Sequence, residues 1–215
     1  MKKLLLYTAG SGSREVLLAI KQINAVKKSW DVIGFVDEDI ALVGKEVDGY
    51  PVYGTDHKEI ANDVYGICCI MNPIIRQRIT HELIEGKNLR LAQIISPSLE
   101  LNGDFEAGPG SIVMPGVTTS FDVKLGKCVF VLWNSLLGHH LRVGNYSTIL
   151  SSANITGGCT IGKRTVIGAG STLNINISVG NDCLVGIGST VLSNIGDKKS
   201  VVSFPRQINN DYKLC

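Results

Sequence analysis

Residues 143–167 read VGNYSTILSSANITGGCTIGKRTVI, and an aliphatic residue returns at every sixth position of this stretch. The same step carried from Val113 to Val191 gives fourteen positions, of which thirteen are aliphatic and one is Thr119. Average composition would place an aliphatic residue at roughly a third of them. A six-residue repeat of this length predicts a parallel β-helix, in which each hexad supplies one short strand.

A longer repeat, of 18 residues, is superimposed on the six-residue repeat. The tripeptides LGK, VGN, IGK and VGN begin at Leu125, Val143, Ile161 and Val179. Three hexads make one triangular coil, so residues 18 apart should stack at the strand spacing of about 4.8 Å. We expect the glycine of each tripeptide to permit a tight corner. The residue two positions before each aliphatic one is usually small. Leu141 and Ile177 are exceptions. The small residues are Ser135, Ser147, Ala153, Cys159, Thr165, Ser171 and Ser189.

The N-terminal half has a different pattern, in which apolar strands alternate with helical spacing. We expect strands at 3–7, 32–36, 65–71 and 91–95 and helices at 15–23 and 73–85, with Ser13 capping the first helix. This alternation predicts an α/β domain with a small parallel, Rossmann-like sheet. With residues 96–98 as the linker, the predicted domains are 1–96, an α/β domain, and 97–215, which is the β-helix with a C-terminal tail.

Composition excludes several classes of protein. The chain is 44% hydrophobic and 19% charged with a net charge of +2, which excludes disorder and the basic footprint of a nucleic-acid-binding protein. No stretch approaches the roughly 20 apolar residues of a membrane span, so we expect a cytoplasmic protein. The six cysteines have neither C-x-x-C nor zinc spacing, and we interpret them as packing thiols.

Two motifs in the N-terminal half are candidates for substrate binding. Gly10, Ser11 and Gly12 form a glycine-rich loop between a strand and a helix, an arrangement that favours an anion. No complete G-x-G-x-x-G is present, so a plain tight turn stays open. Asp37 and Glu38 follow the second strand, where carboxylates meet a ribose or base in this topology. A solvated acidic loop is the alternative.

The candidate catalytic residues lie in the repeat. His139 and His140 follow a predicted strand, and at least one side chain must point outward, where an imidazole suits general-base work. Gly157 lies 18 residues after His139, and its backbone N–H could stabilise an oxyanion by roughly 3 kcal/mol. A surface histidine pair and a corner glycine are the alternatives. A zinc site would need a third histidine in the coil, so we expect no metal.

At these residues the sequence resembles bacterial nucleotide-sugar acetyltransferases of the sialic-acid O-acetyltransferase and bacillosamine N-acetyltransferase type. The resemblance covers nearly the whole chain. The matching segments are 7–16 (YTAGSGSREV), 34–38 (GFVDE), 49–54 (GYPVYG), 96–97 (SP) and the region of His139 followed by Val143 and Gly144.

The resemblance implies that domain 1–96 binds the nucleotide-sugar. It also implies a left-handed β-helix, a homotrimer, and acetyl-CoA bound in clefts between subunits. It implies that His139 takes a proton from the sugar amine and that the Gly157 N–H contacts the acetyl carbonyl. The pantetheine arm would run near four further residues, which are Ile167, Ala169, Gly186 and Ile187.

The sequence differs from this family at three positions near the family's functional residues. His140 replaces the usual acid after the catalytic histidine, so we count it as a third candidate catalytic residue. Gly12 replaces a loop histidine, and Thr8 replaces the first glycine of the loop.

Three functions follow as hypotheses. The first is acetyl-CoA-dependent N-acetylation of a nucleotide-linked amino sugar by direct attack, for the synthesis of a surface polysaccharide or glycan. The second is O-acetylation of a sialic-acid-like sugar, which depends more heavily on the base and is disfavoured by the missing acid. The third is a nucleotide-sugar-binding protein without catalysis.

Overall fold

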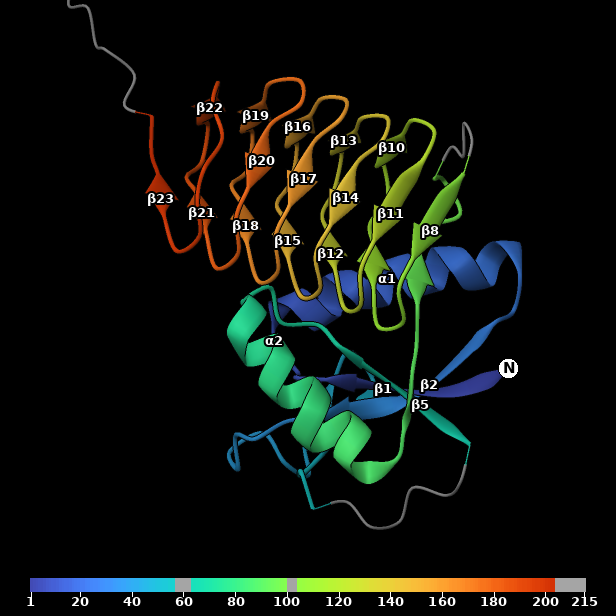
Figure 1. Cartoon of the computed structure of the whole chain (residues 1–215). Coiled ribbons are helices and arrows are strands. Elements are labelled where there is room, and N and C mark those ends of the chain that lie inside the picture. Colours follow the sequence, from blue (N-terminus) through green and yellow to red (C-terminus); the bar gives the residue numbers. More distant parts are fainter. Residues whose placement is uncertain (57–62, 100–103, 204–215) are drawn as a thin grey trace, which may run out of the picture.

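The computed structural model describes residues 1–56, 63–99 and 104–203. An α/β part at the N-terminus is followed by a triangular β-helix, and the α/β part covers one side of the β-helix (Figure 1). The predicted fold class is therefore confirmed for both halves.

The N-terminal part contains a six-stranded sheet in the order β3-β4-β2-β1-β5-β6. All neighbouring pairs are parallel except β3 with β4, which form a hairpin. The strands are β1 (Lys2–Tyr7), β2 (Trp30–Val36), β3 (Glu46–Val47), β4 (Tyr50–Tyr53), β5 (Val64–Cys68) and β6 (Arg90–Leu91).

Helices cover both faces of this sheet. Alternate residues of β1 separate the two cores: Leu4 and Leu6 pack with α1 (Ser11–Val26), whereas Leu5 and Tyr7 pack on the opposite side. That second side is covered by α2 (Pro73–Ile79), which continues into the π-helical turn η1 (Thr80–Ile84) and the 3-10 turn η2 (Glu85–Lys87). The period of two along β1 is what allows one short strand to serve both cores.

Several local predictions need correction. Helix α1 begins at Ser11 with Gly10 at its N-cap, so Ser13 is a buried residue of the first turn and not the cap. The β3–β4 hairpin was missed, although its turn, Asp48-Gly49 with φ of 50° and 82°, is a strong hairpin dipeptide.

The last strand expected in the N-terminal half is two strands. β6 belongs to the N-terminal sheet, whereas β7 (Ile94–Ile95) pairs with the first full coil of the β-helix. The chain therefore crosses to the β-helix between Leu91 and Ile94.

The β-helix is left-handed and has three parallel faces. We call the face that receives β7 the domain face, because the N-terminal part lies on it. It contains β7, β9 (Ile112–Val113), β12 (Phe130–Val131), β15 (Thr148–Ile149), β18 (Val166–Ile167), β21 (Leu184–Val185) and β23 (Ser200–Val201). A second face contains β8 (Phe105–Ala107), β11 (Val123–Leu125), β14 (Arg142–Val143), β17 (Thr160–Ile161) and β20 (Ser178–Val179). The third contains β10 (Thr118–Thr119), β13 (Leu136–Leu137), β16 (Asn154–Ile155), β19 (Thr172–Leu173) and β22 (Thr190–Val191).

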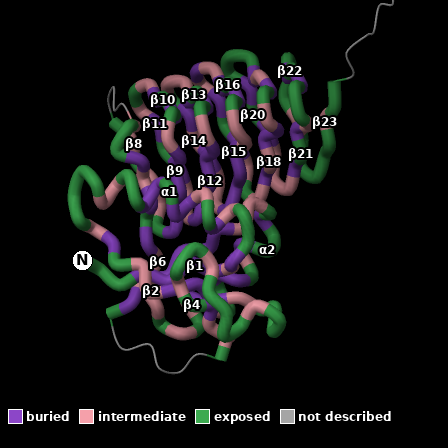
Figure 2. Tube along the Cα trace, turned by 180° about the vertical axis from the view of Figure 1, so that it is seen from behind, coloured by how far each residue is buried: buried purple, intermediate pink, exposed green. Residues whose placement is uncertain are grey.

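Strand pairing confirms the 18-residue coil, since Leu137 pairs with Ile155 and Val143 with Ile161. The repeated aliphatic residues line a continuous interior, which Figure 2 shows as buried stripes along the coils. The small residues that precede them are also buried, and the exceptions Leu141 and Ile177 point into the same interior. The core has room for these two larger side chains.

The corner glycines act differently from our expectation. Gly144 and Gly162 do not have positive φ; the left-handed residue of these corners lies two positions later, at Tyr146 (φ 64°) and Arg164 (φ 54°). A Cβ on Gly144 would lie 2.6 Å from the backbone of Gly162 in the next coil. Glycine is needed there because successive coils approach closely.

The two halves share one hydrophobic core. Residues of α1 such as Val16 and Leu17 cluster with Phe130 and Leu132 of the domain face. Arg76 of α2, only 1% exposed, reaches from the other side to the corner that begins this face. The orientation of the N-terminal part on the β-helix is therefore fixed by buried contacts.

Candidate active site

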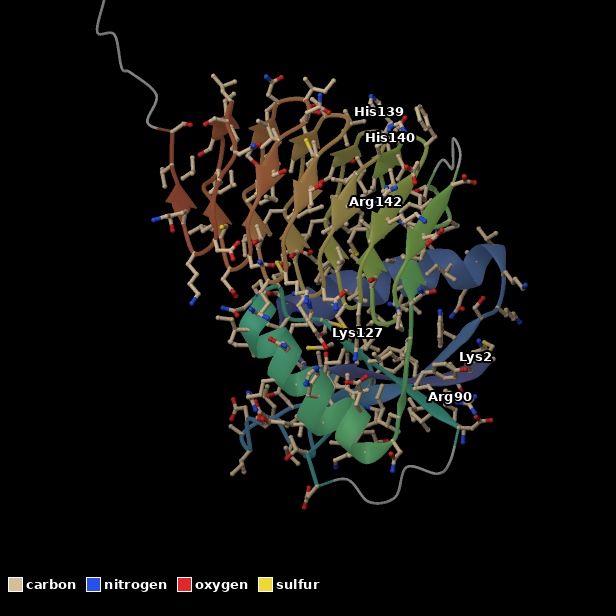
Figure 3. All side chains as sticks on the ribbon, in the orientation of Figure 1. Lys2, Arg90, Lys127, His139, His140 and Arg142 are labelled. Atoms are coloured by element: carbon tan, nitrogen blue, oxygen red, sulfur yellow. The ribbon has the colours of Figure 1, made fainter. Side chains whose placement is uncertain are left out.

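The predicted catalytic histidines lie on the edge of the β-helix opposite the domain face (Figure 3). We call this the histidine edge; it consists of two columns of corner residues stacked at 18-residue intervals. The first column is Phe121, His139, Gly157 and Ile175, and the second is Asp122, His140, Gly158 and Asn176. Every residue of the second column has a positive φ, between 53° and 72°.

His139 and Gly157 lie in direct contact, as their spacing suggested. A Cβ built on Gly157 would be 2.2 Å from both Cε1 and Nε2 of the imidazole. The Gly158 N–H donates to the His139 carbonyl at 2.7 Å, which fixes the two coils at this point. Only glycine can occupy position 157 without displacing the imidazole ring.

The backbone N–H of Gly157 donates no hydrogen bond to any residue that the structure describes. At another edge, the corresponding N–H groups of Lys127 and Lys163 are capped by the Oδ1 atoms of Asn145 and Asn181 in the next coil. The residue at that place on the histidine edge is Ile175, which has no acceptor. The Gly157 N–H is thus left available for an oxygen from outside the chain.

Phe121 and His140 contact the His139 ring, and Asp122 lies beyond His140. Phe121 stacks on it with ring centroids 5.4 Å apart and an interplanar angle of 11°. His139 Nδ1 and His140 Nδ1 are 2.9 Å apart, and His140 Nε2 is 3.9 Å from Asp122 Oδ2. Two hydrogen bonds from Arg142 hold the Asp122 carboxylate and keep the pKa of that carboxyl below its ordinary value.

Sequence reasoning identified His139, His140 and Gly157 but missed Phe121, Asp122 and Arg142. The signal was present, since Phe121 and Asp122 lie 18 residues before His139 and His140.

The candidate substrate residues gather at the carboxyl edge of the N-terminal sheet. A cleft of about 310 Å³ is lined by residues that include Thr8, Asp37, Glu38 and Arg78. The N-terminus of α1 lies beside the ends of β1 and β5, and its first turn has no acidic residue and no side-chain cap. Unpaired N–H groups there favour an anion.

The two acidic residues of this cleft are already engaged. Asp37 accepts from the N–H groups of Ala9 (2.7 Å) and Asp39 (2.9 Å), so it ties the glycine-rich turn to the end of β2. Glu38 forms two hydrogen bonds with Arg78, which lower the pKa of its carboxyl. Asp37 therefore shapes the cleft, and Glu38 with Arg78 forms its rim.

Two of the positions at which the sequence departs from the family it resembles, Thr8 and Gly12, lie in the glycine-rich turn, and the structure accounts for Gly12 but not for Thr8. Thr8 has a φ of 89°, a conformation that favours glycine, and its hydroxyl is 3.0 Å from that of Ser13. A Cβ on Gly12 would be 2.7 Å from the backbone oxygen of Cys69, so no side chain fits there.

Gly12→Ala should lower the free energy of unfolding by about 2 kcal/mol, because the clash with a backbone atom outweighs the gain in helix propensity of about 1 kcal/mol. Gly10→Ala is the matched control. A Cβ at Gly10 would have no atom within 4 Å, and the change should cost less than about 1 kcal/mol, which is the disadvantage of alanine against glycine at an N-cap. Urea unfolding of both variants measures this, and equal stabilities would show that the close approach at Gly12 is unimportant.

The residues expected along the pantetheine arm lie on yet another edge. Ala169 and Ile187 stack at the corner that follows the domain face, where the Gly188 N–H donates to the Ala169 carbonyl, and Gly186 directly precedes Ile187. Ile187 is 76% exposed, but the Ile167 side chain is fully buried inside the coil, so only its backbone could line a site. In one chain, these residues lie on a different edge from the histidines. The histidines in turn lie at the edge away from the α/β part that contains the cleft (Figure 3).

The cysteines of the described residues are all buried and free of disulfides. Burial raises the pKa of Cys68 to about 11 and also raises that of Cys159, which lies beside Gly157. Such thiols are poor nucleophiles at neutral pH. Within the described ranges, no group of three potential ligands could hold a metal ion, and no helix is long and apolar enough to cross a membrane.

Comparison with known proteins finds one matching family model and several solved structures of similar fold. Residues 140–174 match the bacterial transferase hexapeptide family (six repeats). No curated protein matches the sequence.

Solved structures match nearly the whole chain. The acetyltransferase domain of PglB from Neisseria gonorrhoeae is 22% identical, with coverage of 94% of this chain and 97% of that chain and a TM-score of 0.81. PerB from Caulobacter crescentus, solved with CoA and GDP-perosamine, is 21% identical, with coverage of 98% of each chain and a TM-score of 0.81. WeeI from Acinetobacter baumannii is 22% identical, with coverage of 94% and 97% and a TM-score of 0.74. The expected hexapeptide-repeat acetyltransferase fold is confirmed.

Proposed function

We propose that this protein is an acetyl-CoA-dependent N-acetyltransferase that acts on the amine of a nucleotide-linked amino sugar. The observation that carries the proposal is the contact of His139 with Gly157 at an exposed edge, where an imidazole and a free N–H lie together. The fold supports it, because one solved structure of the PglB domain contains acetyl-CoA and that of PerB contains CoA with GDP-perosamine. The protein would work in the cytoplasm, as the sequence led us to expect.

The proposed reaction needs no covalent enzyme intermediate. The amine attacks the thioester carbonyl while His139 Nε2 accepts its proton, and the Gly157 N–H donates to the developing oxyanion. Collapse of the tetrahedral intermediate expels the CoA thiolate, which takes up a proton. No metal is required, since the base and the oxyanion donor come from the chain.

We further propose that the active site forms between subunits of a homotrimer. The cleft and the α1 N-terminus lie on the α/β part, on the domain-face side of the β-helix, whereas His139 lies at the opposite edge. Ala169 and Ile187, which we propose line the CoA site, lie on a different edge again. A neighbouring copy that presents its cleft to the histidine edge would complete the site.

An assay with acetyl-CoA and a panel of nucleotide-linked amino sugars and hydroxy sugars tests the reaction. We expect release of free CoA thiol with an amino sugar and acetylation of its nitrogen. Turnover of hydroxy sugars alone would replace our proposal with O-acetylation. Tight nucleotide-sugar binding without thiol release from any acceptor would replace it with a binding protein.

Mixed oligomers test the shared site. Ser11→Asp places a carboxylate at the exposed α1 N-terminus, where it should repel a phosphate, and His139→Ala removes the base. Each variant alone should be nearly inactive. Coexpression at equal levels should restore about a quarter of wild-type activity, because about one interface in four then combines two intact halves.

The control is a mixture of the two variants purified separately and not allowed to exchange subunits. Coexpressed oligomers that remain as inactive as this mixture would show that each site is built within one chain.

A further inference from the structure

The side chains behind the His139 ring form an ordered chain toward a carboxylate. The geometry points to a relay in which His140 and Asp122 are positioning residues: they set the tautomer of His139 and stabilise the charge that it gains. This inference rests on the proposed role of His139 as base. It places the supporting acid one coil earlier than His140, on the same edge.

The tautomers follow from the contacts. His139 Nε2 faces Gly157 and must be unprotonated to accept a proton, so its Nδ1 carries the hydrogen. That N–H then donates to His140 Nδ1 at 2.9 Å, which leaves the hydrogen of His140 on Nε2. His140 Nε2 in turn faces Asp122 Oδ2 at 3.9 Å, within ion-pair range. Each imidazole therefore has one preferred tautomer.

The proton balance of the relay is simple. When the amine attacks, His139 Nε2 gains one proton, and the Nδ1 proton can pass to His140 Nδ1. The net positive charge then lies on His140, next to the Asp122 carboxylate. When the CoA thiolate leaves and is protonated from His139 Nε2, the Nδ1 proton returns and both imidazoles are neutral again. No bond other than N–H changes in the relay.

The surroundings keep this arrangement in place. Asp122 receives two hydrogen bonds from Arg142, at 2.7 and 2.8 Å, which fix its oxygens and keep it ionised. The aromatic ring of Phe121 stacks on His139 and meets His140 edge-on. The charged groups that face the pair are Asp122 and Arg142, and Lys124 beyond them pairs with Glu106.

Substitutions at His140 can separate the relay from simple packing. His140 has a φ of 55°, and Asn and Asp tolerate this conformation, as Asp122 and Asn176 show in the same column. His140→Asn retains an acceptor for His139 but cannot pass charge to Asp122. His140→Asp places a carboxylate directly behind His139.

We expect His140→Asn and Asp122→Asn each to lower kcat by roughly 30-fold, with KM changed less than about threefold. The acid-side midpoint of the kcat/KM profile should move to lower pH by roughly 0.5–1 unit, because the cation is less stabilised. The double variant should be no slower than His140→Asn alone, and His140→Asp should regain most of kcat. Asp182→Asn is the matched control: it breaks a similar Arg–Asp pair, with Arg164, on another edge, and should leave kcat unchanged.

Additive losses in the double variant, or an unchanged pH profile in Asp122→Asn, would overturn the relay. Nitrogen-15 NMR of the imidazoles tests it independently of any acceptor. The wild-type protein should show hydrogen on Nδ1 of His139 and on Nε2 of His140, and the opposite tautomers would also overturn it. If the panel assay finds no acetyl transfer while these tautomers are observed, the proposed function fails and the relay geometry stands.

Discussion

Arg76→Met should lower the free energy of unfolding by about 4 kcal/mol. This loss should be larger than that caused by replacing Arg78, the other arginine of α2. The Arg76 guanidinium is buried and faces no carboxylate among the described residues. It donates instead to the carbonyls of Ile70, Met71, Cys128, Tyr146 and Ser147 and to the hydroxyl of Thr148. Burial lowers its pKa to about 10, so it is still a cation at neutral pH.

The loss of stability comes from buried carbonyl acceptors that no longer receive a hydrogen bond. Among the described residues, the carbonyls of Ile70, Cys128 and Tyr146 receive a hydrogen bond from Arg76 alone. Each buried acceptor without a donor costs about 1–3 kcal/mol, and methionine can satisfy none of them. Because these carbonyls lie on both the α/β part and the β-helix, the variant should also loosen the junction between them.

Arg78→Met is the matched control, two residues along the same helix. Arg78 is exposed and pairs with Glu38 and Glu82, so its loss should cost less than about 1 kcal/mol. Urea unfolding followed by circular dichroism measures both variants. If Arg76→Met is as stable as Arg78→Met, the neutral acceptors around Arg76 are not essential to the fold.

The β-helix was predictable because its order is periodic. Each coil repeats the same contacts, so the aliphatic positions and the stacking of His139 on Gly157 follow from counting by six and by eighteen. The same count places Asp122 at the same corner position as His140, one coil earlier. The three edges are equivalent in this pattern, however, and the sequence does not say which face the N-terminal part covers. The separation of His139 from the substrate cleft could therefore not be foreseen.

Contacts that do not repeat along the chain could not be predicted from the sequence either. Arg76 meets four of its six acceptors 52 to 72 residues further along the chain, and three of these four are backbone carbonyls, which any sequence provides. The start of α1 was misplaced because Ser13 is a good capping residue by type. Its hydroxyl instead bonds within the turn to Thr8, and the cap is a glycine with no side chain.

His139→Ala should lower kcat by about 10²–10⁴-fold in the N-acetylation reaction, with KM for both substrates nearly unchanged. The substitution removes the proton acceptor next to Gly157 but no expected contact with the nucleotide or CoA. The variant should fold normally, because the His139 side chain lies outside the core formed by the repeated aliphatic residues. Initial rates of CoA thiol release at saturating substrates measure the effect.

Two further variants make the His139 result specific. His81→Ala removes a histidine of η1 that bonds the Tyr146 hydroxyl at 2.8 Å, far from this edge, and should retain wild-type kcat. Gly157→Ala adds a Cβ where the His139 ring now lies, so it should lower kcat by displacing the base while His139 remains present. A His139→Ala enzyme that keeps more than a tenth of wild-type kcat would remove His139 from the role of base. A Gly157→Ala enzyme with wild-type kcat would show that the His139 ring can leave its present position without loss of activity. The contact between His139 and Gly157 would then not be what organises the site.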